Sequence, residues 1–183
     1  VDLLQHNIEL VTDHIRHKLM EKGETDIERK CLRFVQAKDG KTYYKDADNL
    51  YWRVSVFIPN AVTKEEVNPE SAFCCGETFG NFQNMLVDLK EPLGETIPDF
   101  HNMELRLRQL REAVSADKAG RVASVKDMIA ELESYADEMC LAERLYREGA
   151  LPKRICHCDT KVNNMMFDKD GKVLCVILSL IHI

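Results

Sequence analysis

The spacing of hydrophobic residues along the chain changes near residue 60. In residues 1–20 the apolar side chains are three or four positions apart, which is the spacing of one face of a helix. Short runs rich in β-branched and aromatic residues follow, separated by turn sequences such as Asp39-Gly40, and such runs are typical of antiparallel strands. These runs are 31–37, 42–44 and 51–58. The first 60 residues are therefore predicted to contain one helix and a small antiparallel sheet.

Beyond residue 60, helical patterns dominate until a final pair of strands. Asn68 and Pro69 predict a helix start, because Asn caps a helix and Pro is favoured at its first position. Gly149 and Pro152 end the last helical stretch. The predicted helices are 68–89, 102–117 and 121–148, and the predicted strands are 164–167 and 173–177, joined by a turn at 168–171.

This order of elements indicates an α+β protein. A helix, antiparallel strands, several helices and a final hairpin follow one another in segregated blocks, unlike the alternation of a doubly wound sheet. We expect a partial N-terminal lobe over residues 1–60 and a mostly helical C-terminal lobe over residues 61–177. A hinge is expected near residues 59–68.

The composition limits the classes of function. The 183 residues carry a formal net charge of -6, which argues against nucleic-acid binding, since that needs a basic surface. No apolar run approaches ~18 residues and no signal-peptide pattern opens the chain, so we expect a cytoplasmic protein without a membrane partner. The Cys count is 7 without a Cys-x-x-Cys pair, which indicates reduced thiols. Residues 156–158 (Cys-His-Cys) do not predict a zinc site, because three neighbouring residues rarely surround one tetrahedral ion.

The segment 157–164, His-Cys-Asp-Thr-Lys-Val-Asn-Asn, fits the pattern H-x-D-x-K-x-x-N of the catalytic loop in kinase-fold phosphotransferases. Phosphoryl transfer requires positioning and charge neutralisation more than covalent chemistry. Asp159 is placed to accept the proton of the acceptor hydroxyl, and Lys161 to neutralise charge on the transferred group. Asn164 is placed to hold Mg²⁺ through its amide oxygen, and His157 to brace the loop by hydrogen bonding.

Each of these residues also has an ordinary structural interpretation. An isolated Asp or Asn in a loop usually serves a turn or a cap, and an isolated Lys is usually solvated. The context favours the catalytic interpretation, because a predicted helix precedes the segment and a predicted β-hairpin follows it directly.

Together with this loop, much of residues 5–177 resembles the phosphotransferase enzyme family that includes aminoglycoside phosphotransferases and choline kinase. Within that family the chain is most similar to the bacterial N-acetylhexosamine kinases. The stretches that carry this likeness are 38–41 (Lys-Asp-Gly-Lys), 51–54 (Tyr-Trp-Arg-Val), 95–101 (Glu-Thr-Ile-Pro-Asp-Phe-His) and 159–164 of the loop.

The resemblance implies a protein-kinase-like two-lobe fold, ATP as the donor, Mg²⁺ as the metal and the anomeric hydroxyl of an N-acetylhexosamine as the acceptor. It also implies that the helix at residues 1–20 carries an acid that pairs with a strand Lys. Glu9 is the candidate acid, and a solvated helix residue is the alternative interpretation of it.

Nucleotide and acceptor contacts are expected from two further segments. The backbone of Val56, Phe57 and Ile58 is the candidate contact for adenine. Phe100 and His101, in a loop before a predicted helix, are candidates for the acceptor pocket, with ordinary loop packing as the alternative.

The sequence departs from the family pattern at both ends. The strand Lys would lie before Val1, so we expect a fragment with an incomplete strand lobe. After residues 173–177 the family pattern has a metal-binding Asp, where this chain has Leu178. Residues 178–183 have a back-translation that matches a sequencing adapter, and we expect a non-native tail rather than a strand extension. Without the Lys and the Asp, the chain itself is expected to be inactive.

Two other functions stay open. The first is a kinase of another acceptor, such as an aminoglycoside, choline or a related alcohol. The second is a pseudokinase-like binding module that has lost its metal acid. The joint presence of Asp159, Lys161 and Asn164 favours a catalytic parent protein.

Overall fold

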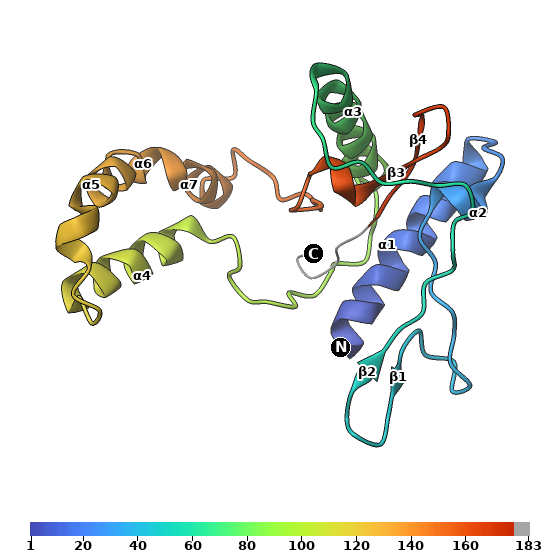
Figure 1. The fold of residues 1–183 in the computed structure, drawn as a ribbon, viewed down its shortest axis with the longest axis horizontal. Helices are drawn as coiled ribbons and strands as arrows, with labels where there is room; N and C mark the ends of the chain where they lie inside the picture. The colour runs from blue at the N-terminus through green and yellow to red at the C-terminus, as the bar shows by residue number, and fades with distance from the viewer. Residues whose placement is uncertain (178–183) are drawn as a thin grey trace. The chain divides into compact units, whose positions relative to one another are not determined.

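The computed structural model describes residues 1–177, which form two compact units (Figure 1). The first unit comprises residues 1–96 and the residues from 154 onward, and the second comprises residues 97–153. The predicted lobe boundary near residue 60 lies inside the first unit, so the division into lobes at that point stays a prediction. Leu178 and the predicted tail lie outside the described residues.

The first unit combines helices with two small antiparallel hairpins. Its helices are α1 (Asp2–Glu21), α2 (Ile27–Lys30), α3 (Pro69–Met85) and the short 3-10 helix η2 (Val162–Asn164). Its hairpins pair β1 (Tyr44–Lys45) with β2 (Tyr51–Trp52), and β3 (Met165–Phe167) with β4 (Val173–Val176).

The second unit is helical in its described structure. It contains α4 (Met103–Ala116), the 3-10 helix η1 (Val122–Val125), α5 (Lys126–Ser134), α6 (Ala136–Met139) and α7 (Leu141–Arg147). Leu107 is the only buried residue between positions 97 and 153. No helix in residues 1–177 combines the length and the apolar character needed to cross a bilayer.

The main core of the first unit lies between α1 and α3. The predicted apolar face of α1 is confirmed, since Ile8, Val11 and Ile15 are buried and pack with Phe82 and Leu86 from the region of α3. A second cluster joins α3 to the β3–β4 hairpin through Phe79, Met165 and Phe167, among other residues. These two clusters hold the hairpin that follows the predicted catalytic loop.

Two of the predicted strands are much shorter than expected. Residues 31–37 contribute one isolated bridge, Phe34 to Ser55, and residues 51–58 form a strand only at β2. The bridge is flanked by hydrogen bonds from the Val35 N–H to the Val54 carbonyl and from the Val56 N–H to the Arg33 carbonyl, both 2.8 Å. A two-stranded ribbon is only marginally stable, so the apolar sequence alone does not extend the ladder.

The predicted helix 121–148 is also wrong as a single element. It is divided into η1, α5, α6 and α7, with breaks around Tyr135 and Cys140. None of its residues is buried, so no packed face holds the segment as one straight helix. The predicted helix 68–89 begins as expected and ends early, at Met85.

The start of α3 is stabilised by a reciprocal cap. The Asn68 side chain accepts a hydrogen bond from the Ser71 N–H at 2.8 Å, and the Ser71 hydroxyl accepts one from the Asn68 N–H at 2.9 Å. Asn68→Ala should therefore lower the free energy of unfolding by about 1 kcal/mol. Urea unfolding followed by circular dichroism measures this change. Asn84→Ala, an exposed change in the same helix, is the control, and equal loss in both variants would contradict the capping role.

Candidate active site

The segment 157–164 lies in the first unit, ends with the 3-10 helix η2 and leads directly into β3. Two backbone hydrogen bonds make it compact: the Lys161 N–H donates to the Asp159 carbonyl at 3.0 Å, and the Asn164 N–H donates to the Lys161 carbonyl at 2.9 Å. The chain therefore doubles back between Asp159 and Asn164. This turn converts a spacing of five residues into direct contact.

The structure brings the side chains of Asp159 and Asn164 together. Asn164 Nδ2 donates to Asp159 Oδ2 at 2.8 Å and to the Asp159 carbonyl at 2.7 Å. Asn164 is buried, so its amide orientation is fixed by these bonds. Among the described residues no hydrogen bond reaches Asn164 Oδ1, and this oxygen stays available to a cation.

Lys161 completes a small cluster of charge. Its Nζ lies 3.1 Å from Asp159 Oδ2, and its side chain is more than half exposed. The hydrogen bond from Asn164, and after it the contact with Lys161, holds the pKa of Asp159 below its ordinary value. Asp159 is therefore a carboxylate at neutral pH, as a proton acceptor must be.

The depressed pKa of Asp159 predicts a pH dependence of stability. Its ionised form is favoured by folding, so this contribution is fully present above the unfolded pKa of ~3.9 and is lost as pH falls through the lower folded pKa. Free energies of unfolding for the wild type and Asp159→Asn should differ by a constant amount above about pH 5 and converge below about pH 4. Convergence beginning near neutral pH would contradict the depressed pKa.

His157 ties the loop to the end of β4. Its side chain is 2% exposed, and Nε2 lies 3.2 Å from the Ile177 carbonyl. The Ile177 N–H in turn donates to the Asn164 carbonyl at 2.7 Å. The ring also contacts Phe79 and Phe82 of α3, with centroids 4.9 and 5.8 Å apart.

These contacts favour a neutral, positioning His157. Burial lowers its pKa, and Nδ1 is buried without a hydrogen-bond partner among the described residues. A neutral ring that donates from Nε2 to the Ile177 carbonyl agrees with the lowered pKa and leaves the buried Nδ1 unprotonated. Cys158, with φ of 63°, occupies the left-handed region and turns the chain between the buried His157 and the partly exposed Asp159.

Two of the residues predicted to bind nucleotide line one cavity. Glu9 and Val56 both border a space of about 540 Å³ beside α1, which neither Asp159 nor Asn164 lines. The half-buried Glu9 accepts a hydrogen bond from Thr42 Oγ1 at 2.6 Å. The sequence analysis missed this Thr, which lay in a predicted strand without any sign of its partner.

The predicted adenine segment offers less backbone than expected. The Val56 N–H already donates a hydrogen bond to the Arg33 carbonyl, and the Ile58 side chain is buried. The Phe57 side chain is 83% exposed, and among the described residues its N–H has no hydrogen-bond partner. Among the described residues the N–H groups of Phe57 and Ile58 have no hydrogen-bond partner, whereas that of Val56 is used.

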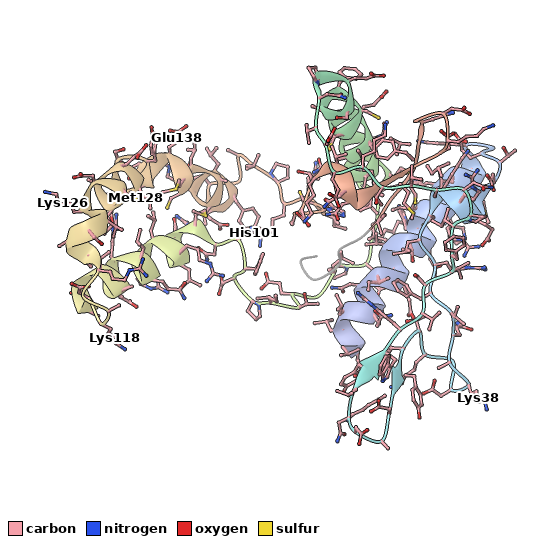
Figure 2. The ribbon with its side chains drawn as sticks, viewed as in Figure 1. Lys38, His101, Lys118, Lys126, Met128 and Glu138 are labelled. Atoms are coloured by element: carbon pink, nitrogen blue, oxygen red, sulfur yellow. The ribbon has the colours of Figure 1, made fainter. Side chains whose placement is uncertain are left out.

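Phe100 and His101 lie in the second unit, on the segment that leads into α4 (Figure 2). Their rings contact each other edge to face, with centroids 4.6 Å apart. Arg106 donates to the Phe100 carbonyl at 3.0 Å, which fixes this turn locally. Their role in acceptor binding stays a prediction.

The Asp159 carboxylate, the Asn164 amide and the Lys161 ammonium meet in one turn before the β3–β4 hairpin. The sequence matches the phosphotransferase enzyme family over residues 18–177. The chain belongs to this family. Membership implies a protein-kinase-like fold, and the described structure is of the α+β class.

Proposed function

We propose that this chain is part of an ATP-dependent kinase that phosphorylates a hydroxyl of a small molecule, and that a longer protein, the parent enzyme, carries out the reaction. The observation that carries the proposal is the contact between the Asp159 carboxylate and the Asn164 amide, with Lys161 beside them. Family membership supports the reaction class.

The cluster has a separate task for each group. Asp159 Oδ2 is occupied by Asn164 and Lys161, so Oδ1 is the atom that accepts the proton as the acceptor oxygen attacks the γ-phosphorus. Lys161, which is exposed, neutralises charge on the transferred group. When bound, Mg·ATP supplies the phosphoryl group and a leaving group of reduced charge, and the P–O bond to ADP breaks.

The residues fit Mg²⁺ incompletely. Asn164 Oδ1 faces no protein donor, and a neutral amide oxygen is a suitable but weak ligand for this ion. Within residues 1–177 no three His, Cys, Asp or Glu side chains converge as metal ligands. A further carboxylate is therefore needed, and Leu178 occupies the position where the family pattern places it.

For the acceptor we propose the anomeric hydroxyl of an N-acetylhexosamine. The proposal follows the likeness of residues 38–41, 51–54 and 95–101 to the N-acetylhexosamine kinases. Aminoglycosides and choline are the alternative acceptors. A lobe hinge near residues 59–68 and adenine contacts from the backbone of residues 56–58 belong to the same proposal.

An acceptor panel tests this assignment. The purified parent enzyme should release ADP with N-acetylglucosamine or N-acetylgalactosamine and not with choline or kanamycin. Turnover of choline or kanamycin without any hexosamine would overturn the choice of acceptor and leave the reaction class intact.

The same assay tests the chain itself. Residues 1–183 should show no turnover, and Leu178→Asp alone should not restore it, because one carboxylate does not supply the strand Lys of the family pattern. Activity of the unmodified chain would contradict the proposed incomplete site.

A further inference from the structure

A second cavity of about 260 Å³ lies in the first unit, and one of its lining residues, Phe82, contacts the His157 ring. It is bordered by α1, by the turn after α2, by α3 and by β4, and it shares no residue with segment 157–164. An engineered cavity of about 150 Å³ holds benzene, so this cavity has room for one aromatic ring and a short chain. The space is therefore of the size of a small organic ligand.

Away from the charged opening, the wall of this cavity is mainly apolar, and its polar residues, Thr12, Thr78 and Asn81, carry no charge. Ile15, Phe82 and Met85 line it together with the thiols of Cys31 and Cys175. Burial raises the pKa of Cys31 to about 12 and that of Cys175 to about 11, so both thiols are protonated at neutral pH. The wall thus suits an apolar group and does not repel an anion.

The opening of the cavity carries more positive than negative charge. Lys30, Lys172 and Glu24 all border the cavity, and Glu24 and Lys172 are exposed to solvent. Lys30 Nζ pairs with Glu24 at 2.5 Å. Among the described residues Lys172 forms no ion pair, and its charge acts at longer range on Glu24, so two ammonium groups and one carboxylate border the opening.

We propose that this cavity binds a small amphipathic carboxylate, with an apolar body against Phe82 and Met85 and the carboxylate at Lys172. Pockets that bind small ligands have this composition, with a mostly apolar wall and a few polar groups that fix the orientation. The site is independent of the proposed kinase reaction, so its test requires no catalytic activity.

The test uses 3-phenylpropionate and the full chain of 183 residues. Calorimetry should give a Kd on the order of 1 mM. The neutral 3-phenylpropanol should bind at least about fivefold more weakly, because it lacks the charge that Lys172 attracts. In spectra of methyl-labelled methionine, the ring should shift the Met85 signal and leave Met128 and Met139 of the second unit unchanged.

Two exposed lysines of the same hairpin separate this site from general attraction to the protein. Lys172→Glu should weaken binding at least about fivefold, since it replaces attraction with repulsion. Lys169→Glu makes the same change of charge at a residue that does not line the cavity, and binding should be retained. Both are surface changes that leave the fold intact.

Three results would overturn the proposal. They are equal affinity for the acid and the alcohol, equal weakening by the two lysine variants, and binding without a shift of the Met85 signal. Absence of binding at about ten times the expected Kd would also overturn it.

Discussion

Asp159→Asn in the parent enzyme should lower kcat by about 10²- to 10⁴-fold, the usual contribution of a general base. The amide keeps the size of the side chain and loses the ability to accept a proton at Oδ1. KM for ATP should change much less. Asp159 contacts Asn164 and Lys161 and does not line the cavity beside Glu9. Steady-state kinetics with saturating acceptor measure both constants.

Asp170→Asn is the matched control for this variant. Asp170 is exposed in the turn between β3 and β4, and its substitution makes the same change from acid to amide. Its kcat should stay within about twofold of the wild type, as expected for surface substitutions. A small effect at Asp159, or similar effects at both positions, would contradict the role of the Asp159 carboxylate.

Phe82→Ala should lower the free energy of unfolding by about 3–5 kcal/mol. The Phe82 side chain is 2% exposed, packs in the core between α1 and α3, and contacts the edge of the His157 ring. It also borders the 260 Å³ cavity, so its removal enlarges an existing space that the surroundings do not fill. Because whole domains are stable by about 5–15 kcal/mol, this one change removes a large share of that stability.

Phe73→Ala in the same helix isolates the effect of burial. Phe73 is 76% exposed, so its truncation should change stability by no more than about 0.5 kcal/mol. Urea unfolding of the two variants side by side gives the comparison. Equal losses would show that the α1–α3 core is not where the structure places it.

The sequence analysis succeeded where a local pattern determines the structure. The apolar spacing in residues 1–20 predicted α1, and Asn68 with Pro69 predicted the start of α3 and its cap. The turn at 168–171 predicted the β3–β4 hairpin. The spacing of Asp159 and Asn164 predicted that their side chains share one site; the structure places Asn164 Nδ2 2.8 Å from Asp159 Oδ2, and the roles of the two residues stay a prediction.

The remaining features depend on contacts between distant residues, which no local pattern contains. The Asn7 amide pairs with Gly94 through two hydrogen bonds, of 2.7 and 3.0 Å, across 87 positions. A Cβ at Gly94 would lie 2.4 Å from Cδ1 of the exposed Leu3 side chain, so a larger residue there would require Leu3 to move. The sequence places Phe79 and Phe82 in the predicted helix 68–89, and only the fold shows that both face the His157 ring.

The most direct test of the central claim is a phosphorus NMR time course with the parent enzyme, Mg·ATP and N-acetylglucosamine. Loss of the ATP signal should be matched by equal growth of ADP and of one phosphate monoester on the sugar, and Asp159→Asn should abolish both signals on the same time scale. Growth of ADP with inorganic phosphate alone, or transfer that continues unchanged in Asp159→Asn, would contradict the assignment of segment 157–164 as the phosphoryl-transfer site.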